Sequence, residues 1–489
     1  MNLVELLDAT ALRQPEHPAI IGPADTDALS YGEFKTEVDE TAALLAHFGV
    51  QAGQCVGLHC PSGRNYICLT YAIWRLGACV VPIPTELSTE EKMRVCQGIA
   101  LDYILTDRAG QKKLASAFAE PGQRLDDLTW IAPAKFFREK PAGFSEVNAA
   151  FIRFTSGTTG TSKGVVLSHE TIRDRIQAAN EALKIGDTDK VLWLLSMSYH
   201  FAVSIVAYVS FGATIILAKN HFAQSLIEAC NRHGITLIYG APMHYELMAH
   251  DTGSARLPNL RLAISTTIAL NRSTVEAFDQ RFGHTLSQAL GVIEIGLPCI
   301  DLYMRPDKWG SVGKLLPAYE LLMEDVGLGS ELGRIKFRGK GFFDAYYDPW
   351  RLREEAMTDG WFDTGDLGVL DADGYLFIKG RSKDIINVAG MKFFPQEVEA
   401  ILNACPGVQE SCVFSHKHDL FGEVPHAQVV LSSPDSVPVD EAELKKHLSQ
   451  HLAHYKIPER IQIVPALIRT ASGKLVRDEN RIKSGETPA

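Results

Sequence analysis

Residues 155–164 read Thr155-Ser156-Gly157-Thr158-Thr159-Gly160-Thr161-Ser162-Lys163-Gly164. An apolar run at 149–154 precedes them, and a helical pattern opens near Ser168, so we predict a strand, a turn and a helix. Glycines let the backbone approach a ligand closely, amide and hydroxyl groups donate to anionic oxygens, and Lys163 adds a positive charge. The spacing is not that of a Walker A loop, because Gly160 lies only three residues before Lys163. The stretch therefore predicts a phosphate-binding turn of another kind.

The same ten residues resemble the phosphate-binding signature of the adenylate-forming superfamily, which contains acyl- and aryl-CoA synthetases, luciferases and peptide-synthetase adenylation domains. The signature of that family is Thr-Ser-Gly-Thr-Thr-Gly-x-Pro-Lys-Gly, and Ser162 stands where its proline is usual. The resemblance implies that the chain binds ATP through Thr155, Ser156, Gly157, Thr158, Thr159 and Lys163.

Composition limits the class of protein. A chain of 489 residues exceeds what one core usually supports, so we expect two or more domains. Hydrophobic residues make up 46% and charged residues 22%, as in soluble globular proteins. A net charge of −11 argues against non-specific binding to nucleic acid or to anionic membranes. The N-terminus lacks a basic signal region and no run of 18 apolar residues occurs, so we expect a cytoplasmic protein without stable membrane insertion.

Helical and strand-like patterns alternate over most of the chain. Strand-like runs at 55–60 and 78–82 flank a helical pattern at 66–76. Between 190 and 300, four strand-like runs recur, with helical patterns at 222–232 and 271–282. The rhythm predicts an α/β fold with two doubly wound, largely parallel sheets. The polar region at 108–146 is predicted to be a surface loop.

The pattern changes in the last third of the chain. Glycine-rich turns between 310 and 341 separate short strand-like runs and predict a small β-rich subdomain. Helical patterns at 395–404 and 440–452 predict an α+β unit at the end. We place the boundary at Lys383, which gives an N-terminal adenylating domain at 1–382 and a mobile C-terminal domain at 383–489.

Leu290-Gly291-Val292-Ile293-Glu294 partly matches the family's Tyr-Gly-x-Thr-Glu. The resemblance implies that Gly291 and Ile293 line the nucleotide site and that Glu294 binds Mg²⁺, for which a carboxylate is suited. Leu290 replaces an aromatic residue that stacks on adenine, and Ile293 replaces a threonine that donates to the α-phosphate. Loss of such a donor is worth roughly 3 kcal/mol, about a hundredfold in rate. Thr266-Thr267 likewise replaces two glycines of the turn that contacts adenine.

Two motifs in the C-terminal third complete the resemblance. Trp361-Phe362-Asp363-Thr364-Gly365-Asp366 matches the motif whose last aspartate binds both ribose hydroxyls, and Arg381 matches a second ribose or phosphate contact. Lys383 stands at the family's hinge. Lys474, in Thr470-Ala471-Ser472-Gly473-Lys474, matches the catalytic lysine that neutralises charge as the acyl-adenylate forms.

His200 matches the family position that borders the acyl pocket, and we count it with Lys474 and Glu294 as a catalytic candidate. No acidic residue lies at 201–204 to pair with the ammonium of an amino acid, which favours an uncharged acyl or aryl carboxylate. Further candidates for the pocket wall are Tyr199, Phe201, Ser204, Tyr239, Met243, Thr267 and Pro298.

The resemblance thus implies an ATP- and Mg²⁺-dependent acid–thiol ligase, first an acyl- or aryl-CoA ligase for a small or medium apolar acid. One alternative is a stand-alone enzyme that loads the phosphopantetheine of an acyl carrier protein, and the sequence does not distinguish the two acceptors. A second is a non-catalytic binding protein derived from the family, against which the retention of Glu294, Asp366 and Lys474 argues. The acid and the oligomeric state are not predicted.

Overall fold

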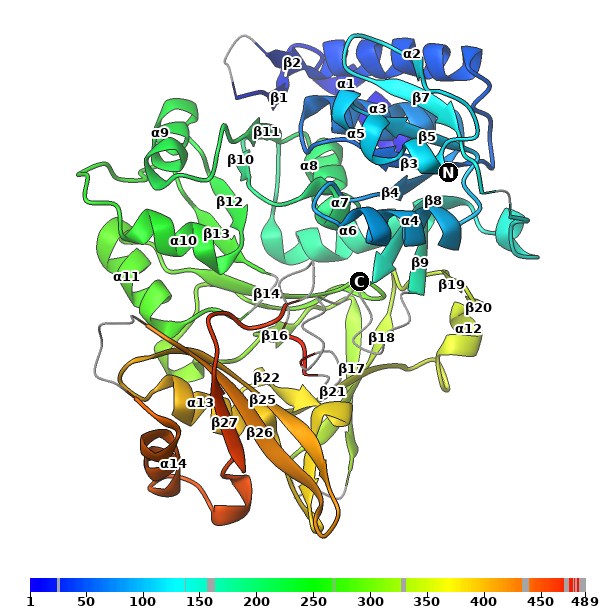
Figure 1. Ribbon diagram of the computed structural model, residues 1–489. Coiled ribbons are helices and arrows are strands. Elements are labelled where there is room, and N and C mark those ends of the chain that lie inside the picture. The colour runs from blue at the N-terminus through cyan, green and yellow to red at the C-terminus, as the bar shows by residue number, and fades with distance from the viewer. Residues whose placement is uncertain are drawn as a thin grey trace. The chain divides into compact units, whose positions relative to one another are not determined.

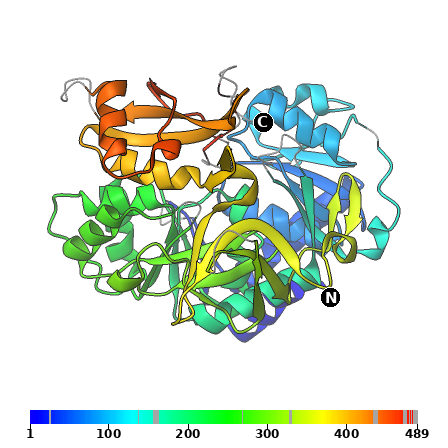
Figure 2. The same cartoon turned by 90° about the horizontal axis from the view of Figure 1, so that it is seen from below.

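The computed structural model describes residues 1–23, 27–136, 138–155, 163–266, 269–326, 331–432, 439–469, 475–477, 479 and 482. These residues form two compact units. The described part of the first unit is 1–155, 163–320 and 338–360, and that of the second is 321–337 and the residues from 361 onward. Figures 1 and 2 show the chain from two directions.

A nine-stranded sheet, sheet 1, has the strand order β16-β15-β14-β13-β12-β10-β11-β1-β2. Its central strands are parallel and its edge pairs β1–β2, β14–β15 and β15–β16 are antiparallel. The strands are β1 (Pro18–Ile21), β2 (Ala28–Ser30), β10 (Lys190–Trp193), β11 (Thr214–Leu217), β12 (Leu237–Gly240), β13 (Leu262–Ser265), β14 (Ser287–Val292), β15 (Gly296–Asp301) and β16 (Lys314–Leu315).

A second nine-stranded sheet, sheet 2, has the order β20-β19-β9-β8-β4-β3-β5-β7-β6. It too is parallel at its centre, across β8, β4, β3 and β5, and antiparallel outside it. The strands are β3 (Cys55–His59), β4 (Cys79–Pro82), β5 (Tyr103–Thr106), β6 (Gln123–Arg124), β7 (Trp130–Pro133), β8 (Ala149–Thr155), β9 (Lys163–Ser168), β19 (Ala345–Tyr347) and β20 (Trp350–Leu352).

Helices cover the sheets of the first unit. Apolar side chains of α9, α10 and α11 form one core with strands of sheet 1, and Figure 2 shows these helices grouped together in green. Such one-sided apolar faces are what bury a helix against a sheet. The helices of this unit are α1 (Val4–Arg13), α2 (Tyr31–His47), α3 (Arg64–Arg75), α4 (Thr89–Gly98), α5 (Arg108–Lys113), α6 (His169–Leu183), α7 (Met197–His200), α8 (Ile205–Phe211), α9 (Ala223–His233), α10 (Pro242–Ala249), α11 (Arg272–Phe282) and α12 (Arg353–Ala356).

The second unit contains two smaller sheets. Sheet 3 has the order β17-β18-β21-β22, and sheet 4 has the order β24-β23-β26-β25, with β27 paired to β26. Helices α13 and α14 pack their apolar side chains on sheet 4, beside which Figure 1 shows them. The elements are β17 (Tyr319–Asp325), β18 (Gly333–Gly339), β21 (Phe362–Leu370), β22 (Leu376–Arg381), β23 (Ile386–Val388), β24 (Met391–Phe393), α13 (Pro395–Asn403), β25 (Val408–His418), β26 (Gly422–Leu431), α14 (Glu441–Ser449) and β27 (Arg460–Ile463).

The predicted α/β class, with two doubly wound sheets, a β-rich subdomain and a C-terminal α+β unit, is confirmed. Two local predictions are wrong. Residues 163–168 form strand β9, so the predicted phosphate turn connects a β-hairpin and does not lead directly into a helix. Part of the expected loop at 108–146 forms β7 and pairs with β5. The structure also shows a pairing that was not predicted from the sequence: β1 at 18–21 joins sheet 1 beside β11 and not the sheet of its sequence neighbours.

All nine cysteines are free thiols. Eight are buried and Cys405 is half-buried. Burial raises the pKa of the Cys96 and Cys230 thiols to about 12. In the part of the chain that the structure describes, no helix is both long and apolar enough to cross a bilayer.

A buried histidine makes the first unit sensitive to acid. His169, 1% exposed, accepts a hydrogen bond at Nδ1 from the Leu3 amide (3.1 Å), and only a deprotonated nitrogen can accept it. Burial lowers the pKa of His169 from 6.5 to about 4. As the pH falls, the His169 imidazole therefore binds a proton in the unfolded chain before it does so in the folded protein. The stabilisation that is present above pH 6.5 is lost as the pH falls toward 4.

We expect His169 to account for about 2 kcal/mol of the stability lost between pH 7 and 4.5. The measurement is urea unfolding at both pH values for the wild type, His169→Gln and the exposed control His250→Gln. The His169 variant should lose less stability on acidification than the other two proteins. An equal loss in all three would contradict the assignment.

Candidate functional site

The described site candidates fall into two groups, which we describe separately. The first unit holds Thr155, Lys163, Tyr199, His200, Phe201, Ser204, Tyr239, Met243, Gly291, Ile293, Glu294 and Pro298. The second unit holds Asp366, Arg381 and Lys383. Ser156, Gly157, Thr158, Thr159, Thr267 and Lys474 lie outside the described residues, as does the side chain of Thr155.

The β8–β9 hairpin brings Lys163 to the candidate nucleotide site. Thr155 pairs with Lys163 where the two strands meet the turn. Strand β19 lies on the other side of β9, with Tyr346 opposite Val165. The Lys163 Nζ atom consequently lies 4.7 Å from the centre of the Tyr346 ring. This is cation–π distance, so the ring face helps to hold the lysine in place.

Tyr346 also connects the lysine to Glu294. Its hydroxyl donates to Glu294 Oε1 over 3.2 Å. Burial, followed by the charge of Glu294, raises the pKa of Tyr346, so the phenol stays protonated and keeps donating. One aromatic side chain thus holds a cation over its face and a carboxylate at its edge. A cation and a carboxylate oxygen are placed together in this way, and these are the kinds of group that can bind phosphate and Mg²⁺.

Replacing Tyr346 with phenylalanine should lower kcat/KM for ATP about tenfold. The ring that contacts Lys163 remains, but the hydrogen bond to a charged carboxylate is lost, and such bonds are worth about 1.5–3 kcal/mol. Pyrophosphate release as a function of ATP concentration measures the effect. Tyr347→Phe is the matched control, because that neighbouring hydroxyl accepts a hydrogen bond from the Ala100 amide and does not contact Glu294. Unchanged kinetics in Tyr346→Phe would refute its role.

A buried arginine fixes the backbone that carries Glu294. Arg175 of α6 is 1% exposed. It donates from Nη1 to the Ile293 carbonyl (2.7 Å), from Nη2 to the Glu294 carbonyl (2.9 Å) and from Nε to the Gly341 carbonyl. Burial lowers its pKa to about 10, so it remains charged at neutral pH. We call this arrangement the Arg175 clamp.

The position of Gly341, whose carbonyl accepts a hydrogen bond from Arg175, requires a glycine. Its φ of +76° lies in the left-handed region, and a Cβ atom there would come 2.7 Å from Cγ of Arg175. The planar fork of the guanidinium reaches three carbonyls from one side chain, which an ammonium cannot do in the same geometry. The side chain of Ile293 has no hydroxyl group. Arg175 holds this residue through its backbone carbonyl.

Tyr239, at the end of β12, contacts two of the other candidate acyl-pocket residues, His200 and Ser204. Its ring stacks on Trp193 with 6.1 Å between centroids and meets His200 edge-on at 6.1 Å. Burial raises the pKa of Tyr239. Hydrogen bonds between Tyr239 and the side chains of Thr266 and Ser204 offset part of this increase. These contacts bring His200, Ser204 and Tyr239 into one aromatic and polar surface.

His200 itself is a poor proton carrier near neutral pH. Burial, and then the charge of Arg153, lowers its pKa to about 3. Arg153 donates to the Tyr199 carbonyl (2.6 Å) and lies 5.2 Å from the Tyr199 ring centre. Burial thus keeps His200 neutral near neutral pH, and Arg153 fixes the short helix α7, which ends at His200.

Three other predicted pocket residues, Phe201, Met243 and Pro298, have different surroundings. Phe201 is fully buried and packs on Tyr66 and Trp74, with 5.8 Å between ring centres in each pair. The ring contacts of Phe201 are thus with helix α3. Met243 on α10 is 52% exposed. Pro298 is buried in β15.

In the second unit, an antiparallel pair places Asp366 of β21 opposite Arg381 of β22. Asp366 Oδ1 lies 3.1 Å from Arg381 Nε. The turn before Asp366 is fixed, since Gly365 has φ +72° and its carbonyl accepts from the Ser382 hydroxyl (3.1 Å). Lys383 follows in a 3₁₀ turn (Ser382–Asp384), and burial lowers its pKa. A partly buried carboxylate beside a guanidinium is suited to two vicinal hydroxyls and an adjacent anion.

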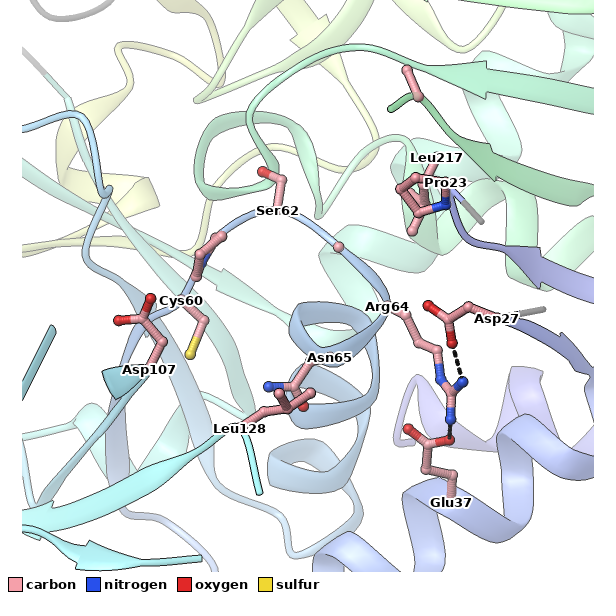
Figure 3. Close-up of a pocket in the computed structure, with 13 residues that line it drawn as sticks. Pro23, Asp27, Glu37, Cys60, Ser62, Arg64, Asn65, Asp107, Leu128 and Leu217 are labelled. Atoms are coloured by element: carbon pink, nitrogen blue, oxygen red, sulfur yellow. Dashed lines mark hydrogen bonds and ion pairs between the residues drawn. The ribbon is translucent and has the colours of Figure 1, made fainter. Parts of the chain in front are cut away.

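A separate pocket of about 540 Å³ lies in the first unit, where β3 ends and α3 begins (Figure 3). On one side of it, Arg64 points toward Asp27 and Glu37 and pairs with both. Cys60 and Asp107 lie on its opposite side. None of the predicted site residues lines this pocket.

Sequence inspection missed Tyr346, Arg175 and Arg153. Tyr346 follows the glycine-rich segment in an aromatic pair, Tyr346-Tyr347, which is the only local signal of its role. Arg175 lies among other charged residues of α6, a pattern that is typical of a solvent-exposed face. Its three carbonyl partners are more than a hundred residues away in sequence.

Comparison with known proteins identifies a family. A family model described as AMP-binding enzyme matches residues 7–347, and one described as AMP-binding enzyme C-terminal domain matches 397–474. The chain is 27% identical to the sulfoacetate–CoA ligase of Cupriavidus necator, over 97% of this chain and 96% of that protein. It is 28% identical to the 2-succinylbenzoate–CoA ligase of Bacillus subtilis, over 95% of each.

Two solved structures have the same fold. The o-succinylbenzoate CoA synthetase of Bacillus subtilis, in complex with its acyl-adenylate, aligns with a TM-score of 0.83 at 25% identity over 99% of both chains. ATP-bound MatB from Rhodopseudomonas palustris aligns with a TM-score of 0.84 at 24% identity over 100% of both chains.

Proposed function

Because the chain belongs to the AMP-binding enzyme family, we propose that it is an acid–thiol ligase that converts a carboxylic acid to an acyl-adenylate with ATP and then to a thioester of CoA. The observation that carries this proposal is the array of Lys163, Tyr346 and Glu294. It combines a phosphate-binding cation with a carboxylate in one unit. The CoA-ligase relatives support the reaction class.

In the first half-reaction, a carboxylate oxygen of the acid attacks the α-phosphorus of ATP, and the bond from that phosphorus to the bridging oxygen of pyrophosphate breaks. Lys163 offsets the charge that develops on the leaving pyrophosphate. Glu294 would hold Mg²⁺ by an oxygen ligand, and the ion would neutralise phosphate charge. The Arg175 clamp and Tyr346 keep the Glu294 backbone and carboxylate in place.

The ribose and the catalytic lysine belong to the same proposal. Asp366 would accept hydrogen bonds from the ribose hydroxyls, with Arg381 beside it. Lys474 would neutralise charge between the α-phosphate and the carboxylate, a role inferred from its motif. The boundary of the proposed domains, 1–382 and 383–489, would be the hinge at Lys383.

In the second half-reaction, the CoA sulfur attacks the acyl carbon, the bond to the AMP oxygen breaks, and the thiol proton is released to solvent. Rotation of residues 383–489 about Lys383 would withdraw Lys474 and admit the thiol. Loading of a carrier-protein phosphopantetheine follows the same chemistry and is the alternative acceptor.

The acid is proposed to be small or medium and uncharged beyond its carboxylate. Aromatic walls at Tyr239 and a neutral His200 favour an apolar acyl or aryl group. Residues 201–204 offer no carboxylate for an ammonium group. With nine free thiols and no disulfide among the described residues, a reducing cytoplasm is the proposed compartment.

The decisive experiment is mass spectrometry of the protein with ATP, Mg²⁺ and a mixed carboxylate library, with and without CoA. An acyl-CoA product supports the proposal and identifies the acid. Acyl-AMP that accumulates and ignores CoA favours a carrier-protein loader. Absence of pyrophosphate and acyl-AMP with every acid would favour a non-catalytic binding protein, for which Ile293→Thr is the first reversion to test.

A further inference from the structure

Two strands and the C-terminal segment bring three potential metal ligands together in the second unit. His416 lies on β25, His426 on β26, and Glu479 follows near the end of the chain. One nitrogen of each histidine and one carboxylate oxygen of Glu479 all lie within 4.8 Å of one another. The cluster is separate from Glu294, which belongs to the first unit.

The hairpin itself sets the position of the two histidines. His416 pairs with Val424, and His426 pairs with Phe414, so the two histidines are diagonal neighbours on one face of the strand pair. Their rings stack with 4.1 Å between centroids and 14° between planes. His416 Nδ1 lies 2.6 Å from Glu479 Oε1. All three side chains are partly exposed, which leaves a path for an ion.

An ordinary ion pair would need only His416 and Glu479. A metal ion gives His426 a role as well, because imidazole nitrogen and carboxylate oxygen are the ligands that Zn²⁺ and similar ions take. Three protein ligands with a fourth position for water are a familiar zinc arrangement. Tetrahedral zinc bonds of roughly 2.0–2.1 Å put ligand atoms about 3.4 Å apart, which side-chain rotation can reach from the present spacing.

We propose that His416, His426 and Glu479 form a binding site for a divalent transition-metal ion of the zinc class. Water completes the coordination, or Glu459 does, whose Oε2 lies 3.9 Å from His426 Nε2. The bound ion joins the chain just downstream of the Lys474 motif to strands β25 and β26. It therefore stabilises the second unit by binding the folded state more tightly than the unfolded state.

The site is tested with full-length protein that has been freed of metal with a chelator and dialysed. Calorimetric titration with Zn²⁺ should show one site. Titration with Co²⁺ should give the visible ligand-field bands of a four-coordinate ion without the charge-transfer band of a cobalt thiolate, because the nine cysteines take no part. No stoichiometric binding, or a cobalt–thiolate band, would overturn the proposal.

Two substitutions locate the ion. His426→Gln and Glu479→Gln should each weaken Zn²⁺ binding at least tenfold. The control is His451→Gln, which alters a histidine pair outside the proposed site: His447 on α14 and His451 just beyond the end of that helix, with rings 5.1 Å apart. Circular dichroism of the metal-free proteins checks that the variants fold, and Glu479→Gln keeps the test valid if His426→Gln does not. Wild-type affinity in both site variants, or loss of binding in the control alone, would refute this site.

Discussion

Replacing Lys474 with alanine should slow pyrophosphate release about 10²- to 10³-fold, while CoA thioester formation from supplied acyl-AMP continues near the wild-type rate. The ammonium group is proposed to act only while negative charge builds up between the α-phosphate and the attacking carboxylate. Removing one such stabilising group from a transition state typically costs this much. The thioester step breaks a different bond and, in our proposal, follows withdrawal of Lys474.

Each half-reaction is measured separately. Isotope exchange between pyrophosphate and ATP reports adenylation, and mass spectrometry of acyl-CoA from chemically prepared acyl-AMP reports the thioester step. Lys417→Ala, which removes an exposed lysine from β25, is the control for a change in net charge. If both half-reactions fall together in Lys474→Ala, the lysine does not act in the first step alone.

The Arg175→Met variant should be less stable by about 2–4 kcal/mol and should need roughly tenfold more ATP and Mg²⁺ for half-maximal activity. Methionine fills a similar space but leaves buried carbonyls without their donor, at about 1–3 kcal/mol each. Removal of a buried charge offsets part of that cost. In this variant the Glu294 carbonyl still accepts a hydrogen bond from the Phe343 amide at 2.8 Å. Most of the destabilisation therefore comes from the carbonyls of Ile293 and Gly341, which lose the donor that Arg175 provides.

The kinetic measurement separates a positioning role from a purely structural one. Urea unfolding gives the stability, and initial rates at varied ATP and Mg²⁺ give the half-saturating concentrations. Arg173→Met on the same helix is the control, because Arg173 is partly exposed and pairs with Asp174. Arg175→Lys should rescue little, since an ammonium lacks the planar fork. Reduced stability with unchanged half-saturation would mean that the clamp does not position Glu294.

Local patterns were enough to predict much of the fold. The runs at 55–60 and 78–82 contain strands β3 and β4, and the patterns at 222–232 and 271–282 are helices α9 and α11 to within a residue. Strand β9 was missed because a short apolar run between a glycine-rich turn and a helix has no periodicity of its own. The pairing of β1 with β11 was missed because it joins segments about two hundred residues apart.

The candidate site was predictable where a motif carries the chemistry and not where distant packing does. Lys163, Glu294 and Asp366 belong to recognisable motifs. Tyr346 gains its role only because β19 pairs with β9, and Arg175 only because α6 packs beside the turn that bears Glu294. Arg175 lies in a charged helical segment, but it is buried and donates to three backbone carbonyls. Helical periodicity alone does not predict this burial or these contacts.

The interior cysteines determine what a colorimetric thiol reagent would report. Eight of the nine sulfhydryls are shielded, and only Cys405 is half-buried. A disulfide reagent reacts with thiolates that it can reach, so in the native protein it would detect CoA almost without background. The unfolded chain would release its whole complement of sulfhydryls at once. While the protein is folded, the absorbance would therefore report the consumption of CoA. When the protein unfolds, the newly exposed thiols would produce a large additional increase in absorbance.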